Sequence, residues 1–294
     1  MVAPAPDIAR ATSADFDALL ALLDAEFIFG KGRRVSLQQR FPETLDRAHS
    51  RNIMLARMEE AIVSALVTRP FTWITSQRSW RAAMIGMVTT RAEWRGRGMA
   101  GALMRAARET LAREGVEFLV LWAARPDFYA GLGWMAADCG ALGSVQTAAP
   151  DATQSAAPFD AASIAWIEAL RREYAPERVE RCEISYAALL PHAEQLELLR
   201  SGSAYAIAGR DDRHGYLYEL LGDAAEFPVL WARLARRYRA LYLNLQRGTA
   251  AERYLSSRGE ISWQPQRLAL WLPLSETARA ARFAGWYVPF LDRI

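Results

Sequence analysis

The residues that could do chemistry lie in the segment 84–134. Its first apolar run ends in the turn Arg95-Gly96-Arg97-Gly98-Met99-Ala100, which leads directly into an amphipathic helix. Glycines let the backbone bend and approach a ligand closely, and the first N–H groups of a helix hold an anion. The guanidinium groups of Arg95 and Arg97 match phosphate oxygens. The turn therefore predicts a site for a phosphate-bearing ligand.

A tyrosine follows the second apolar run, Phe118–Trp122. Tyr129 would give the anion site a proton donor. The turn is not a Walker A loop, because no Gly-Lys-Ser/Thr follows it. Gly96, Gly98 and Gly101 match the spacing of a dinucleotide-binding loop, but no carboxylate follows the next strand to bind a ribose. We therefore do not expect a dinucleotide site.

Two motifs in this segment resemble those of the GNAT superfamily of N-acetyltransferases. The segment 88–100 is similar to its acyl-CoA signature, Arg/Gln-x-x-Gly-x-Gly/Ala, with Arg95, Gly98 and Ala100 at the three defining positions. The segment 128–134 is similar to the family's Phe-Tyr-x-x-x-Gly-Phe. Because the opening residues 8–16 also resemble the family's first strand and helix cap, the resemblance covers about residues 7–140.

The resemblance implies an activity and a set of binding residues. The cofactor would be acetyl-CoA or a related acyl-CoA, and an amine would attack its thioester directly. A main-chain N–H near Val88 would polarise the acyl carbonyl, and Tyr129 would protonate the leaving thiolate. The residues that the resemblance implies for cofactor binding are Met87, Val88, Thr89, Arg95, Gly96, Arg97, Gly98, Met99 and Ala100.

The base that accepts the amine proton is the open part of the site. A carboxylate is the usual choice, and the apolar run 84–90 contains none. Glu26 lies among apolar residues of the first helical region and is our candidate, because it could face the acceptor. Glu59, Glu60 and Glu93 are alternatives, although the first two are also typical of a hairpin turn and the third of a solvated loop. Ala124 stands where many relatives have an asparagine.

Periodicity predicts the elements around these motifs. Helices are expected from Phe16 and over Val35–Ala48, and a hairpin is expected to turn at Glu59-Glu60. The stretch 146–159 is rich in alanine, proline, threonine and serine, which is typical of a linker.

The second half of the chain repeats the order of the first. A strand pair, a helix, a strand and a short helix are expected over residues 203–221, 227–238, 240–245 and 250–256. Asp223 replaces the glycine turn and Leu255 the tyrosine, so we interpret this half as a degenerate copy. The predicted fold is α/β (α+β), with two tandem GNAT-like domains, each a mixed central sheet flanked by helices. The expected boundaries are 1–145 for the catalytic domain, 146–159 for the linker and 160–294 for the second domain.

This tandem order resembles the first two domains of the Eis-type acetyltransferases, without their sterol-carrier-like domain. In those relatives the C-terminal carboxylate is thought to act as a base, so Ile294 is a further open candidate. The degenerate half is expected to shape the acceptor cleft, and the aromatic segment 285–290 to pack across both domains.

Composition limits the function classes. The chain has 294 residues and a net charge of +3, which does not argue for nucleic acid. No run is long enough to span a membrane, and the first residues do not form a signal peptide. Cys139 and Cys182 are expected to be free thiols in a reducing cytoplasm, and three scattered histidines predict no metal.

The function predicted from the sequence is acyl-CoA-dependent N-acetylation of a primary amine. The partner would be a small-molecule or peptide amine, and a homo-oligomer is left open. The alternative is a non-catalytic acyl-CoA-binding or sensor protein.

Overall fold

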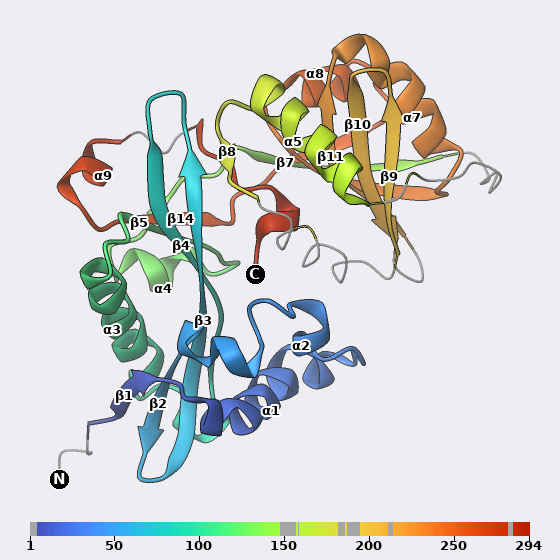
Figure 1. Ribbon diagram of the computed structural model, residues 1–294. Helices are drawn as coiled ribbons and strands as arrows, with labels where there is room; N and C mark the ends of the chain where they lie inside the picture. Colours follow the sequence, from blue (N-terminus) through green and yellow to red (C-terminus); the bar gives the residue numbers. More distant parts are fainter. Residues whose placement is uncertain are drawn as a thin grey trace.

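A computed structural model describes residues 5–147, 157, 159–181, 186, 195–210, 214–281 and 285–294. The chain forms two mixed sheets flanked by helices, so the predicted fold class is confirmed (Figure 1). Cys182 and His192 lie outside the described residues, as does most of the predicted linker. Cys139 is free and buried. No helix of the described part is long and apolar enough to cross a membrane.

The first sheet has eight strands and one parallel pair. β4 and β5 run parallel, and every other neighbouring pair is antiparallel. In spatial order the strands are β1 (Asp7–Arg10), β2 (Ile53–Met58), β3 (Ala61–Ile74), β4 (Ser79–Thr90), β5 (Phe118–Trp122), β14 (Ala269–Pro273) and β6 (Met135–Ala136), with β8 (Arg178–Val179) paired to β3. The expected hairpin is confirmed, and Glu59 in its turn has a φ of 56°.

Helices cover both faces of the first sheet. α3 (Met99–Arg113) buries its apolar stripe, including Leu103 and Ala107, against one face, and α1 (Phe16–Phe27) packs on the other. Because side chains alternate along a strand, neighbouring residues of β3 enter different cores: Leu66 faces α3 and Val67 faces α1. α4 (Pro126–Ala130) follows β5. The glycine turn that begins α3 is thereby held at one end of the sheet.

The helix predicted over residues 35–48 is wrong in its extent. An α-helix, α2, covers only Leu37–Arg40, and a separate 3-10 helix follows at Arg47–Asn52. Pro42 explains the break, because a proline pushes the preceding residue out of the helical region. Phe41 accordingly has φ −136° and ψ 60°.

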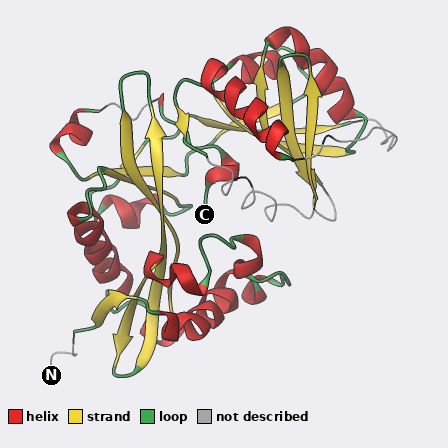
Figure 2. Ribbon diagram, in the orientation of Figure 1, coloured by secondary structure: helices red, strands yellow, loops and turns green. Residues whose placement is uncertain are grey.

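The second sheet repeats the pattern of the first. Its parallel pair is β11 with β12, and its other pairs are antiparallel. The spatial order is β13 (Ser262–Pro265), β7 (Gly140–Gln146), β12 (Ala240–Gln246), β11 (Gly215–Gly222), β10 (Ala204–Arg210) and β9 (Gln195–Ser201). α5 (Ala161–Tyr174) packs on one face, and α7 (Phe227–Ala235) and α8 (Ala250–Ser256) on the other (Figure 2). A last short helix, α9 (Glu276–Ala280), follows β14.

The two sheets exchange a strand. β14, from the second half of the chain, pairs with β5 in the first sheet, and β7, from the first half, pairs with β12 in the second. Each exchanged strand therefore lies antiparallel beside the second strand of a parallel pair. The boundaries expected at residues 145 and 160 remain a prediction about folding units, and the strands of the sheets do not follow them.

Candidate active site

The first sheet opens at its parallel pair. β4 and β5 are paired only where Ala82–Met84 face Phe118–Val120, although β4 continues to Thr90 and β5 to Trp122. Past Met84 the two strands have no ladder between them. This open end of the sheet can admit an extended ligand, because strand backbone without a ladder partner offers N–H and C=O groups for bonding.

A β-bulge lies on β4 next to the opening. Gly86 pairs with Val67 and Thr89 with Ala65, so Met87 and Val88 together face the single residue Leu66. Met87 has a φ of 52°, which is uncommon for a residue other than glycine. Bulges re-aim the strand and remove residues from the ladder. Val88, whose N–H was predicted to face the acyl carbonyl, is thus a bulge residue.

The glycine turn has the conformation that its sequence predicts. Gly96 and Gly98 have φ values of 75° and 79°, which only glycine adopts without strain. A Cβ at either position would meet no atom within 4 Å, so conformation and not crowding requires glycine there. α3 starts at Met99 with no side chain capping its first amides. These amides are available to an anion.

A cavity of about 380 Å³ joins the turn, the bulge and α4. Its lining residues are Glu26, Val88, Thr89, Thr90, Arg95, Ala100, Arg125, Phe128 and Tyr129. Six predicted site residues therefore come together, from α1, β4, the turn, α3 and α4. This is a site built by tertiary structure from elements far apart in the sequence.

Glu26 forms an ion pair with Arg95 of the glycine turn. Its Oε2 lies 2.8 Å from Nη2 of Arg95, and Nε of Arg95 donates to the carbonyl of Thr90 at 3.0 Å. Both side chains are about half exposed, so this ion pair contributes little to stability. It places the one carboxylate of the cavity lining directly beside the predicted diphosphate site.

Tyr129 is partly buried, with its ring oriented by two aromatic neighbours. The ring centroids of Phe128 and Trp134 lie 4.9 and 6.2 Å away, both edge to face. Burial raises the pKa of Tyr129 above its ordinary value of 10.0, because desolvation disfavours the phenolate. The side chain is therefore a neutral phenol at physiological pH, which is the form that can donate a proton.

The other predicted residues surround the cavity without lining it. Met87 lies in the bulge, the side chain of Arg97 stacks over Trp94 at 4.7 Å, and that of Met99 is buried in the core. Gly96 and Gly98 would act through their backbone. Sequence reasoning did not assign Thr90, Arg125 or Phe128. Phe128 stands in the motif around Tyr129, and Arg125 directly precedes α4, so both positions carried a signal.

The described residues of the second sheet show no equivalent of this arrangement. β11 and β12 also separate after three paired residues, ending at Leu217 and Leu243. Tyr287 is bonded there, since its hydroxyl lies 2.6 Å from Oδ1 and 3.1 Å from the carbonyl of Asn244. Asp223 accepts the N–H of Ala225 at 3.0 Å, so a carboxylate occupies the place where the first half has its glycine turn. Both observations explain why this half would not hold a diphosphate.

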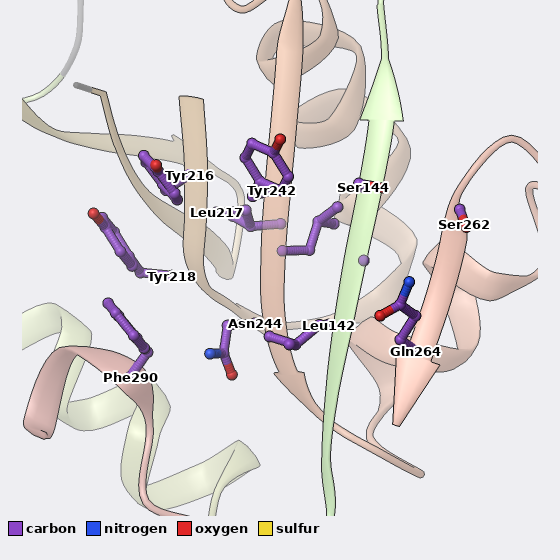
Figure 3. A pocket seen from close by; sticks show the side chains of 12 residues that line it. Leu142, Ser144, Tyr216, Leu217, Tyr218, Tyr242, Asn244, Ser262, Gln264 and Phe290 are labelled. Atoms are coloured by element: carbon purple, nitrogen blue, oxygen red, sulfur yellow. The ribbon is translucent and has the colours of Figure 1, made fainter. Parts of the chain in front are cut away.

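A second cavity, of about 330 Å³, lies on the second sheet near this point (Figure 3). Tyr216 and Tyr218 on β11 stack on each other with centroids 5.9 Å apart, and Tyr218 stacks on Phe290 at 5.8 Å. The remaining lining is neutral, with Asn244 and Gln264 as its amides. None of the predicted site residues lines this cavity.

Gly98→Ala tests the turn. We expect acetyl-CoA to bind about 5- to 30-fold more weakly, because a side chain at this positive φ costs about 1–2 kcal/mol. The turn would relax and move its amides away from the ligand. Gly248→Ala is the matched control: its φ is 77° and its Cβ would also meet nothing within 4 Å. Titration calorimetry and thermal unfolding measure both variants. If Gly98→Ala and Gly248→Ala bind acetyl-CoA with equal affinity, the prediction that this turn binds the diphosphate is wrong.

Comparison with known proteins finds a family match in the first half of the chain. Residues 7–137 match the family described as acetyltransferase (GNAT) domain. No curated protein matches the chain. Among the described residues, no group of three His, Cys, Asp or Glu side chains is placed to hold a metal ion.

Three solved structures match more than nine-tenths of the chain. A GCN5-related N-acetyltransferase from Kribbella flavida has a TM-score of 0.69 at 17% identity, over 94% of this chain and 73% of that one. Eis1 from Mycobacterium abscessus has a TM-score of 0.65 at 13% identity, over 92% of this chain and 74% of that one. A tandem GNAT protein from the clavulanic acid biosynthesis pathway has a TM-score of 0.57 at 11% identity, over 92% of this chain and 99% of that one. At such identities the likeness shows the fold, and it confirms the tandem GNAT arrangement.

Proposed function

We propose that the chain is an acyl-CoA-dependent N-acetyltransferase, because residues 7–137 match the family described as acetyltransferase (GNAT) domain. It moves an acetyl group from acetyl-CoA to a primary amine of a small molecule or peptide. One observation carries the proposal: the open end of β4 and β5, an uncapped helix N-terminus and a partly buried phenol meet at one cavity. The open end suits an extended arm, the helix N-terminus suits a diphosphate, and the phenol suits a sulfur leaving group.

The described residues fit acyl-CoA as a substrate. The backbone amides from Gly96 to Ala100 and the side chain of Arg95 would hold the diphosphate. Arg125 offers a further cation at the cavity. Met87, Val88 and Thr89 would line the arm, and the N–H of the bulge would polarise the acyl carbonyl. Acyl-CoA supplies the activated carbonyl carbon.

Two side chains would then move protons. The acceptor amine forms the new C–N bond as the C–S bond breaks, and Tyr129 gives its proton to the departing sulfur. The proton of the amine passes to a carboxylate. Glu26 is our candidate, because it is the carboxylate among the cavity-lining residues.

Ile294 is the other candidate for the role of base. A free carboxylate at this residue would lie against Gly86. A Cβ built on Gly86 would stand 2.9 Å from the carbonyl oxygen of Ile294. Gly86 directly precedes the bulge, so Ile294 lies beside the bulge of β4. Glu26 and Ile294 are both candidates, and the Glu26→Gln variant distinguishes them.

The alternative is a protein that binds acyl-CoA without catalysis. Tyr129 favours the enzyme, because a binder has no need of a proton donor at that place. The test is a screen of primary amines with purified protein and acetyl-CoA, which detects the free thiol released. We expect at least one amine to release thiol in proportion to protein concentration. Binding of acetyl-CoA by calorimetry with no release from any amine would favour the binder, and no binding would refute both.

A further inference from the structure

The last ten residues of the chain run between the two sheets. Figure 1 shows the C-terminus in the middle of the molecule. Trp286 packs in the core of the first sheet, 5.7 Å from the ring of Trp73 and 5.0 Å from that of Phe118. Tyr287 is bonded to Asn244 of the second sheet. The predicted packing of residues 285–290 across both halves is therefore confirmed.

A buried ion pair anchors the end of this tail. Asp292 accepts two hydrogen bonds from Arg181, at 2.8 Å from Nε and 2.7 Å from Nη2. Nη2 of Arg181 also lies 2.8 Å from Glu219 of β11. The Arg181 side chain is 0% exposed and that of Asp292 is 1%. Burial alone would raise the pKa of Asp292, but the charge and hydrogen bonds of Arg181 lower it, so the pair is ionised.

The first sheet holds the same tail from its other side. Nη1 of Arg69 on β3 donates to the carbonyl of Asp292 at 2.8 Å. The guanidinium of Arg293 lies over the ring of Trp122 on β5, 4.7 Å from its centroid. Ile294 packs against residues of both cores on this side of the sheet. The tail therefore has contacts with β3, β4 and β5 around the open end of the sheet.

These contacts determine where Ile294 lies. Its carbonyl oxygen and carbon would stand 2.9 and 3.1 Å from a Cβ on Gly86, so this residue of β4 is a glycine beside the tail. A buried ion pair adds little net stability over well-packed apolar residues, but it permits one geometry and disfavours others. The Arg181–Asp292 pair therefore suits a role in fixing the position of Ile294.

We propose that Arg181 and Asp292 are positioning residues that hold Ile294 against the β4 bulge. The second half of the chain thereby provides one wall of the acceptor side of the first. This inference rests on the proposed function for its effect on turnover. It does not require Arg181 or Asp292 to touch a substrate.

Asp292→Asn tests the inference with two readouts. The first is the rate at which a carboxypeptidase releases Ile294, followed by mass spectrometry, and it needs no turnover. The second is kcat with the best amine of the screen, together with the Kd of acetyl-CoA. We expect release to be at least tenfold faster and kcat at least fivefold lower, with the Kd within twofold of the wild type.

Glu197→Gln is the matched control. Glu197 is also a buried carboxylate of the second sheet, and it is hydrogen-bonded to Arg237 and Tyr238, away from the tail. Glu197→Gln should change neither the rate of Ile294 release nor kcat. If Asp292→Asn does not fold, the double variant Arg181→Met with Asp292→Leu removes both charges and keeps apolar packing. We expect it to give the same two effects.

Three results would overturn the inference. They are unchanged release of Ile294 in a folded Asp292 variant, faster release with unchanged kcat, and an equal effect from Glu197→Gln. A wild-type chain that turns over no amine would instead refute the proposed function. The release rates would then decide by themselves whether the pair anchors the tail.

Discussion

Tyr129→Phe is expected to lower kcat by about 10²- to 10⁴-fold and to leave the affinity for acetyl-CoA unchanged. General acids contribute rate factors of this size. The phenyl ring of the variant would keep the packing against Phe128 and Trp134. Loss of the hydroxyl alone removes the proton that the leaving sulfur requires. Steady-state thiol release and calorimetry measure the two quantities on the same preparation.

The pH dependence gives a second check on this role. An acid works only while it is protonated, and burial raises the pKa of Tyr129 above 10.0. Activity in the wild type should therefore not fall through loss of this proton until the pH exceeds 10. Tyr242→Phe is the control, because Tyr242 is an exposed tyrosine of the second sheet. A Tyr129→Phe variant with wild-type turnover would remove the tyrosine from the mechanism.

Glu26→Gln is expected to lower kcat by about 10²-fold or more, because the amide cannot accept the proton of the amine. The Kd of acetyl-CoA should stay equal or fall slightly, since Arg95 loses its partner at 2.8 Å and becomes free for the diphosphate. Single-turnover thiol release measures the effect.

The outcome decides between the two carboxylates. A fall in kcat of less than tenfold in Glu26→Gln would assign Glu26 to the ion pair with Arg95 alone. A free carboxylate at Ile294 would then be the next candidate for the base. Adding one glycine after Ile294 tests this directly, because it converts the carboxylate beside Gly86 into an amide. Loss of turnover in that variant, with acetyl-CoA still bound, would support Ile294.

The local parts of the site were readable from the sequence. Gly96 and Gly98 have positive φ values because the turn between strand and helix needs them, and short-range sterics determine that requirement. Tyr129 lies where its motif places it, one short helix after β5. The one clear error concerned an element boundary: Pro42 breaks the helix expected over residues 35–48, and periodicity alone does not register such a break.

Only the tertiary structure decided which segments lie side by side. The sequence indicated a repeat, but not that β7 and β14 would be exchanged between the two sheets. It named Glu26 and Ile294 as candidates without placing one beside Arg95 and the other beside Gly86. The pairing of Arg181 with Asp292 joins residues far apart in the chain. A turn is determined by the sterics of a few neighbouring residues, whereas strand partners and buried ion pairs depend on the packing of the whole chain.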